Sequence, residues 1–156
     1  MSSLYNLQQF KEGYKFTNNK GDEYYAYFTP FSLKTPEDEV IETISFGFEC
    51  KRFGSQKRQV YDERTKLTII HIIHNYFKVN GDNALLYICL NNDGKARQRN
   101  VTFNRWFTEL GQGYERHKSK IETERLNFYS SILVKKSNTK KKKFIDAFNY
   151  TIDFWF

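Results

Sequence analysis

The sequence predicts an α+β fold: an antiparallel or mixed sheet of about five strands, with a main helix over about residues 62–78 packed on one face. Three observations favour this class. Aromatic and polar residues alternate in several segments of strand length, residues 62–78 place apolar side chains at helical spacing, and residues 84–90 form a continuous apolar run. With 156 residues, 39% of them hydrophobic, the chain is expected to form a single domain over residues 1–156.

Two aromatic segments near the N-terminus predict a β-hairpin over residues 14–16 and 24–31, because the Asn, Gly and Asp between them are typical of a turn. Pro30 cannot donate to a sheet, so it limits the second strand to an edge or ends it at Thr29. Residues 33–38 predict a loop. A third strand then runs from residue 39 or 40 to about residue 53, with one buried face and one wetter face.

The helix at 62–78 is the best-defined element. Its apolar stripe faces the sheet, acidic residues lie at its positive end, and Asn80-Gly81 supplies a stop. His71 and His74 lie off the centre of this stripe. Two histidines at this spacing can share a metal or act as general bases, but no third ligand lies nearby in sequence, so we assign them surface or boundary roles.

The apolar run at 84–90 predicts a strand that is buried on both faces, followed by a polar, cationic loop. Apolar spacing predicts a further helix near 103–110, capped by Thr102 and closed by Gly111. A hairpin with residues 96–103 as the return strand is the less favoured alternative.

Residues 112–125 are polar, typical of an exposed helix or a loop, and residues 126–134 return to strand character. The last segment fits both a helix and a strand, and its Asp, Ala and Asn residues favour a helix over 144–155. The terminal aromatic side chains 154–156 are expected to pack against the body of the protein or against a partner.

The net charge of +7 arises from 25 Lys and Arg against 18 Asp and Glu, a balance that suits a polyanionic ligand. The cations form four groups, and the sequence does not say whether these groups converge. The candidate anion-binding residues follow the apolar run: Lys95, Arg97, Arg99 and Arg105. The structural alternatives are a clasp between Asp93 and an arginine, and a solvated turn at 140–143.

These patterns predict a non-enzymatic binding module whose partner is nucleic acid, another polyanion or an acidic protein. Two alternatives stay open: an assembly component that uses the aromatic C-terminus, and a nuclease or toxin-like hydrolase that uses His71 or His74 with Asp93. No catalytic, cofactor or metal motif is present in the sequence. Cys50 and Cys89 are expected to be buried free thiols, and the absence of an apolar leader or span predicts a cytoplasmic protein.

Several short segments resemble a small family of uncharacterised bacterial proteins, mostly from Bacteroidota, that share a domain of unknown function. The resemblance rests on residues 27–31, residues 86–89, the cations around Asp93, and Arg105-Trp106-Phe107. It covers roughly residues 24–148. It implies a bacterial origin and one small α+β domain, and it supplies no activity or catalytic residue.

Overall fold

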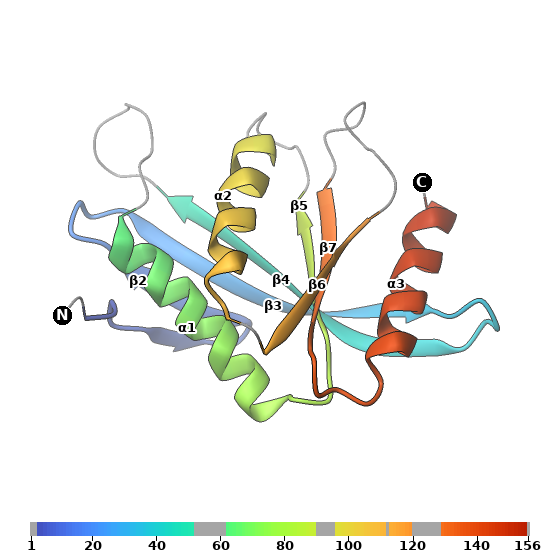
Figure 1. Cartoon of the computed structure of the whole chain (residues 1–156). Helices are drawn as coiled ribbons and strands as arrows, with labels where there is room; N and C mark the ends of the chain where they lie inside the picture. The colour runs from blue at the N-terminus through green and yellow to red at the C-terminus, as the bar shows by residue number, and fades with distance from the viewer. Residues whose placement is uncertain (1–2, 52–61, 90–95, 112, 120–128, 156) are drawn as a thin grey trace.

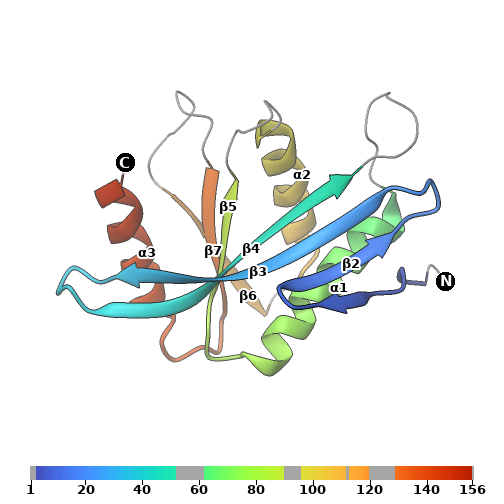
Figure 2. The same ribbon diagram turned by 180° about the vertical axis from the view of Figure 1, so that it is seen from behind.

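A computed structural model describes residues 3–51, 62–89, 96–111, 113–119 and 129–155. They form a seven-stranded sheet with three helices (Figures 1 and 2). The strands are β1 (Gln8–Phe10), β2 (Gly13–Thr17), β3 (Glu23–Lys34), β4 (Val40–Lys51), β5 (Leu85–Cys89), β6 (Tyr114–Lys118) and β7 (Tyr129–Lys135). The helices are α1 (Glu63–Val79), α2 (Ala96–Thr108) and α3 (Lys141–Trp155). The predicted α+β class and its three helices are confirmed.

The sheet has the order β1-β2-β3-β4-β5-β7-β6, and its one parallel neighbour pair is β4 with β5. The predicted number of about five strands is wrong because β1 and β6 were missed. β1 is three residues long, and β6 has the sequence YERHK, which contains no aliphatic residue. Both are edge strands, so their conformation comes from pairing with a neighbour, which a local pattern does not reveal.

The antiparallel pairing of β2 with β3 confirms the predicted hairpin, but β3 is longer than predicted. β2 pairs with β3 only as far as Tyr27, so Pro30 lies where β3 has a free edge on that side, and the strand continues to Lys34. The loop predicted over 33–38 is therefore shorter. Leu33 is fully buried in β3, because α3 packs against this end of the hairpin.

The sheet separates two hydrophobic cores. One lies between the sheet and the helices α1 and α2, and includes Phe46, Phe77 and Phe103. The other lies on the opposite face beneath α3, and includes Leu86, Ile132 and Phe148. Both views place α3 at one end of the β3–β4 hairpin and α1 at the other (Figures 1 and 2).

β5 contributes to both cores, which explains its continuous apolar sequence. Leu85 and Tyr87 point toward α1 and α2, whereas Leu86 points toward α3, and each of these side chains is at most 4% exposed. A strand that is covered on both faces does not need to alternate apolar and polar residues. The predicted doubly buried strand is confirmed, although the side chain of Cys89 lies outside the described part.

The two shorter helices are confirmed with corrected starts. α2 begins at Ala96, so Thr102 lies inside the helix and does not cap it, and the alternative of a return strand is wrong. Gly111 takes a φ of +99°, as a residue that follows a helix commonly does. α3 begins at Lys141, just after Asn138, whose side-chain oxygen accepts a hydrogen bond from the Lys140 backbone.

The C-terminal aromatic residues do not all pack as expected. Phe154 is 78% exposed, so its ring is not held against the body of the protein. The side chain of Trp155 and the whole of Phe156 lie outside the described residues. The assembly role assigned to this end of the chain stays a prediction.

α1 begins where the sequence predicts because Asp62 caps it. The Asp62 side chain accepts hydrogen bonds from the Thr65 backbone N–H at 2.6 Å and from the Tyr5 hydroxyl at 2.7 Å. Burial opposes ionisation of this carboxyl, but the hydrogen bonds outweigh it and hold the pKa of Asp62 below its usual value.

We expect Asp62→Ala to lower the free energy of unfolding by about 1 kcal/mol through loss of the cap. Asp62→Asn keeps a capping oxygen but removes the charge. Because the folded pKa is depressed, the charge stabilises the fold above the unfolded pKa of about 3.9, and this contribution is lost as the pH falls through the folded value. Urea denaturation should show that the difference in free energy of unfolding between wild type and Asp62→Asn becomes smaller toward low pH. A difference that does not change with pH would contradict this assignment.

Candidate polyanion-binding surface

The parallel strands β4 and β5 position the candidate surface because they separate toward their carboxyl ends. Their ladder joins residues Ile44 to Phe46 with Leu85 to Tyr87, and beyond it β4 continues to Lys51. Figures 1 and 2 show the two strands diverging, with α2 beside the point where they part.

Aromatic side chains of α2 fill the wedge between these strands. Phe103, which is 1% exposed, stacks on Tyr87 at a centroid distance of 4.1 Å and on Phe48 at 5.5 Å. Trp106 also stacks on Phe48, at 5.7 Å. These contacts fix the inner face of α2, so the rotation of the helix, and with it the outer face, is determined by packing.

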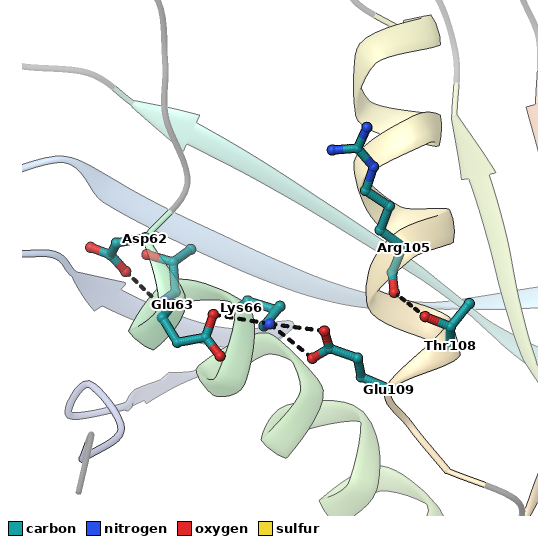
Figure 3. Close-up of polar contacts among 7 residues, drawn as sticks. Asp62, Glu63, Lys66, Arg105, Thr108 and Glu109 are labelled. Atoms are coloured by element: carbon teal, nitrogen blue, oxygen red, sulfur yellow. Dashed lines mark hydrogen bonds and ion pairs between the residues drawn. The ribbon is translucent and has the colours of Figure 1, made fainter.

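A charged clasp joins the C-terminal part of α2 to α1 (Figure 3). Lys66 of α1 contacts Glu63 at 3.0 Å and Glu109, just after α2, at 2.9 Å. Arg105 takes no part in the clasp. Its carbonyl accepts a hydrogen bond from the Thr108 hydroxyl, and its guanidinium points away from these carboxylates (Figure 3).

The four sequence-predicted anion-binding residues do not form one group. Lys95 lies outside the described residues. Arg97 and Arg105 are exposed on the same outer face of α2, about 12 Å apart along the helix axis from the rise per residue. Arg99 is half-buried on the inner side of the helix and makes a further interaction there.

Arg116 of β6 belongs to one of the four cationic groups in the sequence but was not among the candidate binding residues, and it adds a third cation beside α2. Its guanidinium donates a hydrogen bond to the Asn104 side-chain oxygen and lies 4.9 Å from the centroid of Phe107. Burial lowers the pKa of Arg116 to about 10, partly offset by Tyr87. The cationic group does not indicate that Arg116 packs against α2, because an arginine in a polar segment is usually solvated.

Arg97, Arg105 and Arg116 have no carboxylate partner in the described part of the chain, as is also true of most of the described lysines. Ion pairs of 2.6 to 3.3 Å hold five lysines: Lys15, Lys34, Lys66, Lys141 and Lys143. Among the residues that the structure describes, none of the ion pairs involves Arg97, Arg105 or Arg116. α2 itself contains three arginines and no Asp or Glu. No acidic residue of α2 itself therefore offsets its positive charge.

The lysines at the start of α3 do not converge on α2. Lysines 140–143 lie around the start of α3, on the face of the sheet opposite α2 (Figure 1). A groove of about 380 Å³ beside them is lined by both signs of charge, and Lys143 contacts Glu39 at 2.7 Å at its side. Lys57, Arg58 and Lys120 lie outside the described residues.

The uncovered face of β1–β3 and β4 carries aromatic rings with balanced charges: Phe10, Tyr25, Tyr27, Lys15, Lys51, Glu23 and Glu49. Lys15 pairs with Glu23 at 2.9 Å, and the Tyr27 hydroxyl donates to Glu49 at 2.7 Å. Burial and this hydrogen bond raise the pKa of Tyr27 to about 12. Two carboxylates offset the two lysines, so this face attracts a polyanion less than α2 does.

The histidines of α1 have ordinary polar partners. Nδ1 of His74 lies 2.9 Å from the Tyr114 hydroxyl, and Nε2 of His71 lies 3.0 Å from the Asn75 amide. Burial, with the nearby His71 and Lys135, lowers the pKa of His74. The described residues contain no cluster of three or more metal-ligating side chains. Asp93 lies outside the described part, so the hydrolase alternative stays a prediction.

The described helices include none that is long and apolar enough to cross a membrane. Cys50 forms no disulfide among the described residues, and it is half-buried, whereas full burial was predicted.

Comparison with known proteins identifies a family. A search of curated proteins and a search of solved structures each found no significant match. Residues 61–150, more than half of the chain, match the model of a family described as "Family of unknown function (DUF6169)". The matched range contains α1, β5, α2, β6 and β7, which hold all the residues of the candidate surface. The comparison names no organism, so the bacterial origin stays a prediction. The chain belongs to the DUF6169 family of unknown function.

Proposed function

We propose that the protein binds nucleic acid, as a polyanion, through an α2–β6 arginine surface formed by Arg97, Arg105 and Arg116. The observation that carries the proposal is the lack of any described carboxylate partner for these three cations. Guanidinium groups bind phosphate with paired donors, and each phosphate neutralised releases counterions. We expect the three arginines to contact phosphate oxygens, and such contacts carry little sequence preference.

A titration with labelled oligothymidine at several salt concentrations tests this function. Because each phosphate contact contributes about 0.7 to the slope of log affinity against log salt for single strands, we expect Arg97→Gln with Arg105→Gln to lower the slope by about 1.4. Affinity at low salt should fall by at least tenfold.

The matched control removes the same charge elsewhere. Lys140→Gln with Lys142→Gln alters two exposed lysines at the start of α3, on the face of the sheet opposite α2. We expect this pair to change the slope by less than the arginine pair. Equal effects of the two pairs would show that binding depends only on net charge. If the wild-type protein did not bind oligothymidine at low salt, the proposed function would be wrong.

A small phosphorylated ligand is the second candidate, favoured by the sheet topology. In sheets with parallel strands, ligands often bind outside the carboxyl ends of the strands. The carboxyl ends of β4 and β5 part beside α2, and Arg97 lies in the first turn of that helix. If the binding free energy per phosphate group is larger for a mononucleotide than for an oligonucleotide, the small ligand is favoured over nucleic acid.

A further inference from the structure

Arg116 is a half-buried cation whose contacts do not balance its charge. Its described partners are the Asn104 side-chain oxygen, which is neutral, and the ring of Phe107. Its Nε atom is buried and has no hydrogen-bond partner. Leaving a buried donor unpaired costs about 1–3 kcal/mol, and a buried charge without a counter-charge costs more.

The nearest acidic residue in sequence does not supply the missing charge. Glu115 is adjacent in β6, but neighbouring strand residues point to opposite faces of the sheet. Its carboxylate contacts Lys141 of α3 at 2.6 Å and His117 at 3.2 Å, on the side away from α2. Arg116 instead faces the core beneath α2, in register with Leu133 of β7.

Among the described residues, α2 supplies no negative charge to Arg116. α2 contributes amide and aromatic groups at this position, and its only ionisable side chains are arginines. A guanidinium held by an amide and a ring is restricted in position, which reduces the entropy lost when a ligand binds. The site is thus pre-organised for an oxyanion, which can accept from the unpaired Nε and the adjacent Nη2 as a fork.

We propose that Arg116 anchors a bound phosphate group between α2 and β6. The inference rests on the proposed function in that it names phosphate as the chemistry recognised by the same surface. The phosphate can come from a free ion, a mononucleotide or a nucleic-acid chain, because all three present the same oxygen atoms. An oxyanion at this position supplies the counter-charge and pairs the buried donor.

Thermal unfolding in inorganic phosphate, with ionic strength held constant by chloride, tests the anchor. Binding to the folded state raises the melting temperature. We expect phosphate to raise the melting temperature of the wild-type protein and to have no effect on Arg116→Met, which keeps the aliphatic stem against Phe107. Arg105→Gln, which removes an exposed arginine of the same surface, should keep most of the shift. A shift shared equally by Arg116→Met, or absent from wild type, would overturn the inference.

A second measurement uses the wild-type chain alone, so it does not depend on how a variant folds. The Nε–H group of Arg116 should give a slowly exchanging proton signal, because the atom is buried. We expect this signal to shift on titration with inorganic phosphate, and separately with a mononucleotide and with oligothymidine. A signal that none of the three displaces would contradict the anchor.

The three titrants separate this inference from the proposed function. If inorganic phosphate or the mononucleotide displaces the signal and oligothymidine does not bind, the anchor stands and the nucleic-acid function fails. If oligothymidine binds with the expected salt slope but leaves the Arg116 signal unchanged, the function stands and the anchor fails.

Discussion

Gly13→Ala is expected to destabilise the protein by about 3 kcal/mol or more, enough to prevent folding of a marginal domain. A Cβ atom built at Gly13 would lie 1.8 Å from the carbonyl oxygen of Ala26 and 2.9 Å from its carbonyl carbon. Both atoms belong to the backbone of β3, which pairs with β2 here, so neither can move without disturbing the ladder. Urea denaturation followed by circular dichroism measures the loss.

Gly47 provides the matched control. It lies in β4, opposite Tyr27 of β3, and a Cβ built there meets nothing within 4 Å. We expect Gly47→Ala to change the free energy of unfolding by no more than about 0.5 kcal/mol, in the stabilising direction, since alanine loses less backbone entropy than glycine. Similar losses at the two glycines would contradict the tight approach of β2 to β3.

Phe103→Ala is expected to cost about 3–5 kcal/mol and to detach α2 from the wedge between β4 and β5. The ring is 1% exposed and lies within 6 Å of four other rings, those of Tyr87, Phe107, Phe48 and Phe46. Removal leaves a cavity that these rings cannot fill together. Chemical denaturation gives the free energy, and tryptophan fluorescence reports the change around Trp106.

Val101→Ala is the control on the same helix. Val101 is 42% exposed on the outer face, and alanine has the higher helix propensity. We expect its free energy of unfolding to stay within about 0.5 kcal/mol of the wild-type value. If Val101→Ala were as costly as Phe103→Ala, the assignment of inner and outer faces of α2 would be wrong.

Elements with a strong local signal could be predicted from the sequence. α1 has an apolar stripe, an N-terminal Asp and a following Asn-Gly, and each of these acts within a few residues. β5 was predicted as doubly buried because its apolar run leaves no polar face. Both features report directly on the local environment of the side chains, so no knowledge of distant contacts was needed.

Elements that depend on tertiary pairing could not be predicted in this way. β6 contains Glu, Arg and His, and it is a strand because β7 offers a partner edge. Leu33 was assigned to a loop because Pro36 and acidic residues follow it, whereas the cover supplied by α3 extends β3 to Lys34. The residues around Leu33 do not indicate that α3, which is distant in sequence, covers this end of β3.

The candidate surface was predicted in part. Arg97 and Arg105 were identified from the cationic segment after β5, but the position of Arg99 on the inner face depends on the rotation of α2. Arg116 was not predicted as a binding residue because its burial comes from Asn104 and Phe107, which lie on a different element, α2. The number of charged residues can be read from the sequence, but only the structure shows which of them form ion pairs.

The central claim is that the uncompensated arginines of α2 and β6 form the polyanion-binding surface. The most direct measurement is a titration of the uniformly 15N-labelled protein with oligothymidine at low salt, followed through its amide signals. The account predicts that the shifts concentrate in α2 and β6, around Arg97, Arg105 and Arg116, and that added salt reverses them. Shifts confined to β1–β3 or to the start of α3, or no shifts at all, would contradict it.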